Sequence, residues 1–123
     1  HPLQKLQVYA EAQHLAHACC DSALAISDRD LRWQLMRASR SIAANLAEGT
    51  GCPSQAAFAR YIAIALASAK ETECHLAFAR QAGMLSPAHH EQLLQMLNRL
   101  APRLVRLLAA VRRNASRRIK PDA

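Results

Sequence analysis

The sequence predicts an all-α protein, and three observations lead to that prediction. Alanine, leucine, glutamine and arginine are strong helix formers, and they dominate the chain. Only three of the 123 residues are glycine, which leaves little material for the turns of a many-stranded sheet. Apolar residues also recur every three or four positions over long stretches, as they do along one face of a helix. A chain of this length has room for one hydrophobic core, so we expect a single domain.

Four helices are expected, and the first covers residues 3–25. It carries two apolar rows at helical spacing, with Leu3, Leu6 and Ala10 in one row and Val8, Ala12, Leu15 and Cys19 in the other. A helix needs one such face to join a bundle core, so the second row suggests a contact with another subunit.

The second helix is expected to begin near Asp30 and to continue to Glu48, with Asp28 or Asp30 as its N-cap. Its apolar face repeats every three or four positions, at Leu31, Leu35, Ala38, Ile42 and Leu46. Gly49 is expected to end the helix, because glycine readily takes the left-handed conformation that often follows one.

The third helix is expected to begin after Ser54, a favourable N-cap, and to reach Ala82. Gly83 follows and should stop it. The connection from the second helix is the loop at residues 49–53, where two glycines and a proline break the helical pattern.

Ser86 as the cap and Pro87 in the first turn open the fourth helix, which we expect to run to Arg113. Its main apolar row alternates steps of four and three, at Leu93, Leu97, Leu100, Leu104, Leu107 and Val111. A second row widens this face, with Leu94, Ala101, Val105 and Leu108. Pro102 lies inside the helix and is expected to kink it.

Short connections between long helices favour antiparallel neighbours, so we expect an up-down-up-down four-helix bundle over residues 1–113. Residues 114–123 are expected to form a basic C-terminal tail. The extra apolar rows of the first and fourth helices suggest that the bundle is one subunit of an oligomer. No apolar run is long enough to cross a membrane and no signal peptide is visible, so we expect a cytoplasmic protein.

Polar side chains flank the apolar faces of the second and third helices, and burying such groups is costly unless they pair. They are Arg37, Ser41, Asn45 and Glu48 on the second helix and Arg60, Ser68 and Glu71 on the third. Each arginine can meet a carboxylate, and the amide and hydroxyl groups can complete the hydrogen bonds. We favour a structural network that sets the helix register. The functional alternative is that the end of the second helix and its loop form part of a ligand or partner site.

Positive charge is concentrated in the last quarter of the chain. The net charge is +7, and residues 99–123 hold eight basic residues and one acidic residue, whereas residues 1–98 hold eight of each. A basic stripe of this kind can contact phosphates without reading bases. The candidate nucleic-acid-binding residues are Arg99, Arg103, Arg106, Arg112, Arg113, Arg117 and Arg118. The alternative is that these arginines solvate the outer face and favour the helix C-terminus through its dipole.

Patterns typical of catalysis or metal binding are weak, and we expect neither enzyme activity nor a cofactor. His14, His17 and Cys20 share one face of the first helix, but a fourth ligand for zinc is missing. Glu71 and His75 are four residues apart, which is not the Glu-x-x-His spacing of di-iron bundles. The four cysteines lack the spacing of a disulfide framework, so free thiols are expected.

Two runs of residues resemble a known family. The first is Gln34-Leu-Met-Arg37-Ala38-x-x-Ser41-Ile42-x-x-Asn45-x-Ala47-Glu48-Gly49, and the second is Phe58-x-x-Tyr61-x-x-Ile64-Ala65-x-x-Ser68-x-x-Glu71-x-Glu73. They resemble the four-helix-bundle proteins encoded in intervening sequences of bacterial 23S ribosomal RNA genes. The resemblance extends over residues 3–113, and its most specific part is the pattern Ser-Ile-x-x-Asn-x-Ala-Glu-Gly.

The resemblance implies a cytosolic four-helix bundle that assembles as a ring-shaped homopentamer. Its fold is similar to that of the accessory protein of diversity-generating retroelements, a basic pentameric barrel that binds nucleic acid and its reverse transcriptase. Two functions follow as hypotheses. One is an oligomer that binds the RNA or DNA backbone, alone or with a protein partner. The other is an oligomeric protein-interaction scaffold without nucleic-acid binding.

Overall fold

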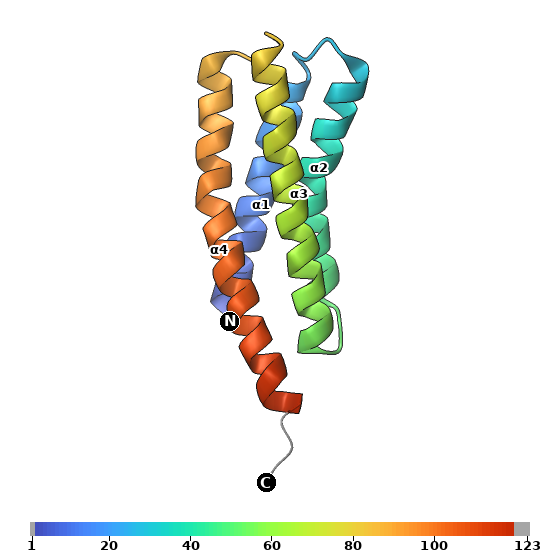
Figure 1. The fold of residues 1–123 in the computed structure, drawn as a ribbon, viewed down its shortest axis with the longest axis vertical. Coiled ribbons are helices and arrows are strands. Elements are labelled where there is room, and N and C mark those ends of the chain that lie inside the picture. Colours follow the sequence, from blue (N-terminus) through green and yellow to red (C-terminus); the bar gives the residue numbers. More distant parts are fainter. Residues whose placement is uncertain (1, 120–123) are drawn as a thin grey trace.

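The computed structural model describes the backbone of residues 2–119 and the side chains of residues 3–117. This part of the chain contains four α-helices and no strand, so the all-α prediction is confirmed. The helices are α1 (Pro2–Ala23), α2 (Arg29–Thr50), α3 (Gln55–Gln81) and α4 (Pro87–Ile119). They lie side by side, and the chain reverses direction at each connection (Figure 1). Both α1 and α3 pack against α2 and α4, so the core lies between the four helices.

The core is aliphatic, and α4 supplies its longest row. The six residues predicted from the alternating spacing are all buried, namely Leu93, Leu97, Leu100, Leu104, Leu107 and Val111. Burying one leucine side chain is worth about 1.5–3 kcal/mol, so this row is a large part of the hydrophobic stabilisation. On α1 the row that begins at Val8 is buried, whereas Leu3 and Leu6 of the other row are 71% and 67% exposed.

The N-terminus of α2 is capped as the sequence predicts, but its C-terminus is not. Asp28 is the N-cap, and its Oδ1 accepts a hydrogen bond from the Leu31 backbone N–H at 2.9 Å. The helix then continues through Gly49 to Thr50. Within the described residues Gly83 is the only glycine with a positive φ. The prediction that Gly49 ends the helix in a left-handed conformation is therefore wrong.

Gly49 is needed for a different reason, which is the close approach of α3. A Cβ atom added to Gly49 would lie 2.6 Å from Cδ1 of Phe58 and 2.9 Å from Cβ of Tyr61. Both distances are far shorter than the ~3.5–4 Å at which carbon atoms attract each other. The side chains of α3 therefore pack directly on the backbone of α2, and any larger residue at Gly49 would push the two helices apart.

Both ends of α3 agree with the prediction to within one residue. Ser54 is its N-cap. At the C-terminal end Gly83 has a φ of 75°, and its N–H donates a hydrogen bond to the Arg80 carbonyl at 3.2 Å. The Met84 N–H donates to the Ala79 carbonyl at 2.9 Å. These two bonds form a Schellman motif, in which a left-handed glycine satisfies the last carbonyls of the helix.

α4 begins at Pro87 as predicted but is longer than predicted. It runs to Ile119 instead of ending at Arg113, because residues 103–119 contain neither glycine nor proline to stop it. The first six residues of the predicted tail are therefore helical, and the last four lie outside the described part of the chain.

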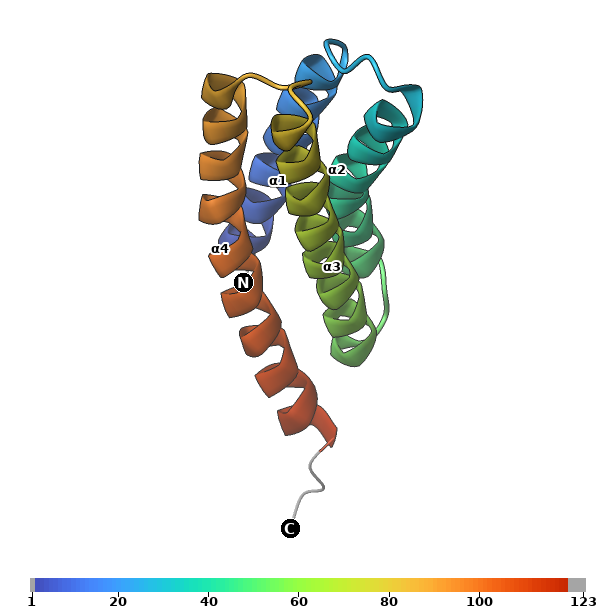
Figure 2. The ribbon, with the colours of Figure 1, turned by 45° about the horizontal axis from the view of Figure 1, so that its top comes forward.

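Pro102 lies in the middle of α4. Figures 1 and 2 show that the axis of α4 changes direction near its middle, and its red C-terminal half runs past the end of the α2–α3 hairpin. Proline has no N–H to donate to the carbonyl of Asn98, which explains a bend at this place. α4 is also the longest of the four helices, with 33 residues, and its last turns project beyond the other three (Figure 1).

In the part of the chain that the structure describes, no helix combines the length and the apolarity that crossing a membrane requires.

Candidate functional site

The C-terminal half of α4 presents a basic face. Residues 99–119 include seven arginines and no acidic residue. Five of them are exposed and form no ion pair with a described residue, and we term these the α4 arginines: Arg99, Arg106, Arg112, Arg113 and Arg117. The side chain of Arg118, which the sequence analysis grouped with them, lies outside the described side chains.

Arg103 differs from the α4 arginines. Its side chain is half-buried, and its guanidinium donates a hydrogen bond to the carboxylate of Glu11 on α1. The pair is a salt bridge that ties the start of the bent half of α4 to α1. Because Glu11 neutralises its charge, Arg103 attracts an external phosphate less than the α4 arginines do.

Three of the seven residues predicted as a polar network do meet between α2 and α3. The hydroxyl groups of Ser41 and Ser68 are 2.8 Å apart and share a hydrogen bond. The side-chain amide of Asn45 donates to the Ser41 carbonyl at 2.8 Å and to the Ser41 hydroxyl at 2.9 Å. Thr72 adds a bond from its hydroxyl to the Ser68 carbonyl at 2.8 Å. This chain of short polar side chains joins two helices inside the bundle.

The four charged residues of the predicted network do not join it. Arg37, Glu48, Arg60 and Glu71 are exposed and form no ion pair with any described residue. Their long side chains can reach water, and a surface ion pair contributes little once solvent screens it. Burying these charges would have cost more than the pairing returned. The expectation of arginine–carboxylate pairs in this network is therefore not met.

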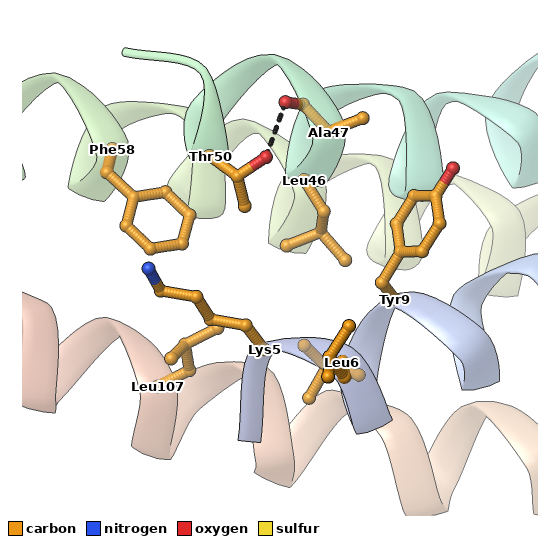
Figure 3. A pocket seen from close by; sticks show the side chains of 9 residues that line it. Lys5, Leu6, Tyr9, Leu46, Ala47, Thr50, Phe58 and Leu107 are labelled. Atoms are coloured by element: carbon orange, nitrogen blue, oxygen red, sulfur yellow. Dashed lines mark hydrogen bonds between the residues drawn. The ribbon is translucent and has the colours of Figure 1, made fainter. Parts of the chain in front are cut away.

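A cavity of about 400 Å³ opens where the N-terminal part of α1 faces the other helices (Figure 3). It is lined by Lys5, Leu6, Val8, Tyr9, Leu46, Ala47, Thr50, Phe58 and Leu107. The Nζ atom of Lys5 lies 5.1 Å from the centroid of the Phe58 ring, a cation–π contact. The Thr50 hydroxyl donates to the Ala47 carbonyl at 2.8 Å. The lining is mainly apolar, and its ionisable side chains are those of Lys5 and Tyr9.

Sequence analysis missed this cavity because all four helices contribute to its lining. Lys5 and Phe58 are far apart in the chain, and the run that contains Phe58 does not include Lys5. A local pattern cannot show that two such residues meet.

The histidine and cysteine side chains of α1 lie in ordinary packing or surface positions, whereas on α3 the Nε2 atom of His75 is buried without a hydrogen-bond partner among the described residues. His14 and His17 are exposed and Cys20 is half-buried, and no three potential metal ligands gather within the described residues. Burial raises the pKa of the Cys19 thiol to about 12, the charge of the adjacent Cys20 adds to the shift, and a hydrogen bond with Ser39 opposes it. Cys19 therefore stays protonated at neutral pH and is a poor nucleophile.

The comparisons with known proteins agree with the resemblance given by the two sequence runs. The model of the family described as 23S rRNA-intervening sequence protein matches residues 4–106. The chain belongs to this family. The matched region contains Gly49, Ser41 and Ser68, the residues at which α2 packs on α3 in this chain.

A solved structure supports the fold independently. It is the crystal structure of a protein with unknown function from the S23 ribosomal protein family of Bacteroides thetaiotaomicron VPI-5482. The two chains are 20% identical and superpose with a TM-score of 0.80, over 86% of this chain and 98% of the other. At this identity the likeness concerns the fold alone. No curated protein matches the chain at a significant level.

The family match ends at Arg106. Three of the α4 arginines, Arg112, Arg113 and Arg117, lie beyond it. Membership of the family therefore says nothing about the most projecting part of the basic face.

Proposed function

We propose that this protein is a non-enzymatic, oligomeric four-helix bundle that binds the backbone of nucleic acid through the C-terminal half of α4. The observation that carries the proposal is the set of exposed α4 arginines without a carboxylate partner among the described residues. A guanidinium can donate two parallel hydrogen bonds to one phosphate. Phosphate contacts carry no sequence information, so we expect binding that tolerates many sequences.

The positions of these arginines support binding over a purely structural role. The helix dipole favours positive charge only within the last turn. Arg99 and Arg106 precede Ile119 by more than three turns at ~3.6 residues per turn, so the dipole does not account for them. The projecting end of α4 also leaves room for a long polyanion to approach (Figure 2).

We further propose that the subunits assemble in the cytoplasm as the homopentamer that the family resemblance implies. Support comes from apolar side chains that the single chain leaves in water. Leu3 and Leu6 belong to the exposed apolar row of α1. Val105, which is 54% exposed, belongs to the second row of α4. Burial of these side chains between subunits would gain about 25 cal/mol for each Å² removed from water.

The proposal is tested by fluorescence anisotropy of labelled single- and double-stranded RNA and DNA over a salt series. We expect binding whose logarithm falls linearly with the logarithm of salt concentration. The double variant Arg112→Ala/Arg113→Ala should bind more weakly and should flatten the slope by about 0.7–0.9 for each phosphate that is no longer neutralised. The matched control is Arg60→Ala/Arg80→Ala, which removes the same charge from exposed positions of α3. Equal effects of the two variants would mean that net charge, and not the α4 surface, drives binding.

The second candidate function is an oligomeric protein-interaction scaffold, and the exposed apolar rows are the observation that favours it. Light scattering on the same samples gives the mass of the oligomer, and this mass is read together with the binding result. A defined oligomer that binds no nucleic acid even at low salt would support the scaffold. Loss of the oligomer in Leu3→Glu/Leu6→Glu would show that the exposed apolar row of α1 forms the subunit contact.

A further inference from the structure

The chain has a single tryptophan, and it lies in water. Trp33 is in the second turn of α2, and 56% of its surface is exposed. The start of α2 lies at the end of the bundle opposite to the projecting end of α4 (Figure 1). Tryptophan is enriched where proteins contact partners, because its large rigid ring gives much contact area at low entropic cost. Trp33 therefore marks a surface separate from the α4 arginines.

Arginines surround this tryptophan. A shallow concavity of about 300 Å³ is lined by Arg29, Arg32, Trp33 and Met36, which share one face of α2. Arg37 and Arg40 follow Trp33 at steps of four and three, so they continue along the neighbouring exposed stripe. We term Trp33 and the four arginines of α2 the Trp33 surface.

This surface carries a net positive charge, and its arginines are available to a ligand. None of its arginines forms an ion pair with a described residue. Residues 28–40 contain two acidic residues, and one of them, Asp28, is engaged as the N-cap of α2. The other, Asp30, is exposed and has no described ion-pair partner. The surface therefore carries four guanidinium groups and only two carboxylates, and its aromatic ring is exposed to solvent.

We propose that the Trp33 surface binds unpaired nucleotides of single-stranded nucleic acid. The indole stacks on one base, and the flanking guanidinium groups contact the phosphates on either side. This inference rests on the proposed function for the class of ligand, but it uses other residues and adds a preference for single strands. Cationic side chains combined with an exposed aromatic ring are the two components that single-strand binding surfaces share.

The ring decides between single-stranded nucleic acid and other polyanions. A duplex hides the faces of its bases inside the stack, so an indole on the surface of a helix cannot reach them. An acidic peptide would pair with the arginines but would offer the indole no base to stack on. A base stack satisfies both, and because every base has such a face the preference for sequence is weak.

The sole tryptophan also makes the inference directly measurable, since fluorescence excited where tyrosine does not absorb reports on Trp33 alone. The full chain is titrated with an unlabelled single strand of mixed sequence, long enough to span the whole surface, and in parallel with the corresponding duplex. We expect quenching of the tryptophan fluorescence by the single strand and little quenching by the duplex at concentrations where both are bound.

Variants then connect quenching to affinity, which is followed by anisotropy of a labelled single strand. Trp33→Ala is expected to bind about tenfold more weakly, as the absence of one base stack implies. Trp33→Phe should recover most of that affinity, because phenylalanine also stacks. The matched control is Phe78→Ala, which removes an aromatic side chain that is 59% exposed on α3 and should leave affinity unchanged. Circular dichroism confirms that each variant is folded.

The outcomes separate this inference from the proposed function. Anisotropy that shows binding without quenching, together with unchanged affinity of Trp33→Ala, would overturn the Trp33 surface and leave the α4 proposal standing. Equal quenching by single strand and duplex would overturn the stacking role. Absence of both binding and quenching at low salt would overturn both proposals. Quenching that survives Arg112→Ala/Arg113→Ala, with weaker binding by Trp33→Ala, would establish the Trp33 surface as an independent site.

Discussion

The α2–α3 interface and the C-terminal half of α4 both carry polar residues along a helix, but they use them differently. At the interface the polar side chains are short, and Ser41, Asn45 and Ser68 satisfy one another while Gly49 lets α3 approach. On α4 the polar side chains are long arginines, and all those that are exposed lack an ion-pair partner among the described residues.

The difference separates residues that the fold requires from residues that are free to bind. A buried polar group must be paired within the protein, so its removal lowers stability. An exposed, solvated arginine contributes little to stability, so its charge can serve a ligand. Substitutions at the α2–α3 interface should therefore lower the free energy of unfolding, whereas substitutions of the α4 arginines should leave it almost unchanged.

The largest effect is expected for Gly49→Ala. Alanine favours the helix by about 1 kcal/mol over glycine, but the clash with Phe58 and Tyr61 opposes this by roughly 1–3 kcal/mol or more. The Cβ of Tyr61 is fixed to its backbone and cannot rotate away, so the clash should lie near the upper end of that range and we expect a net loss of up to about 2 kcal/mol. Urea unfolding at fixed protein concentration measures this loss.

Gly51→Ala is the matched control for that substitution. Gly51 has a φ of −82°, and the nearest atom to an added Cβ is the Glu48 carbonyl oxygen at 3.5 Å. Alanine fits there without strain, so the free energy of unfolding of Gly51→Ala should be unchanged or higher by about 0.4–1 kcal/mol. A Gly49→Ala variant as stable as Gly51→Ala would contradict the close approach of α3 to α2.

A smaller loss is expected for Ser68→Ala, which removes the hydrogen bond between the two serine hydroxyls. The expected cost is about 1 kcal/mol, because the Ser41 hydroxyl keeps its bond from Asn45. A double-mutant cycle with Ser41→Ala should show a coupling energy of about 0.5 kcal/mol or more. Arg60→Ala, on the same helix but exposed, should change stability by less than about 0.5 kcal/mol.

A still smaller effect distinguishes two arginines within α4. Arg103→Ala breaks the partly exposed salt bridge to Glu11 and should cost about 0.2–1 kcal/mol, with the cost falling as salt is raised. Arg106→Ala should leave stability unchanged while weakening nucleic-acid binding. If thermal unfolding shows that Arg103→Ala and Arg106→Ala lower the stability equally, the distinction between Arg103 and the α4 arginines is wrong.

A similarly small change in stability is expected when the chain is ended after Arg113. No residue between 112 and 117 is buried, so the truncated protein should unfold within about 0.5 kcal/mol of the full chain. Nucleic-acid affinity should nevertheless fall, because Arg117 is removed with the other basic residues of this segment. A large fall in stability would mean that the projecting end of α4 is packed against another subunit.

Much of the fold is predictable from the sequence because its signals are local. The N-caps at Asp28 and Ser54 and the stop at Gly83 each depend on a few neighbouring residues. The buried row of α4 follows from spacing alone. The predicted end of α4 is wrong because basic composition suggested a tail, although no helix-breaking residue occurs between Pro102 and Ile119.

The candidate site is predictable only in part. The exposure of the α4 arginines follows from their places outside the leucine row. The pairing of Arg103 with Glu11 does not, because the two residues are brought together by the packing of α4 on α1. Likewise the pattern identifies Arg37 as a flanking residue but cannot show whether it turns inward or toward water.

The sequence by itself determined the four helices, most of their caps and the apolar rows of the core, since these depend on residues within one or two turns of each other. Only the tertiary structure decided why Gly49 is a glycine, which polar residues pair, which arginines remain free and where the cavity opens. Each of these joins residues from different helices. The relative register of two helices is set by how their side chains interlock, and that information is not contained in the spacing along either helix alone.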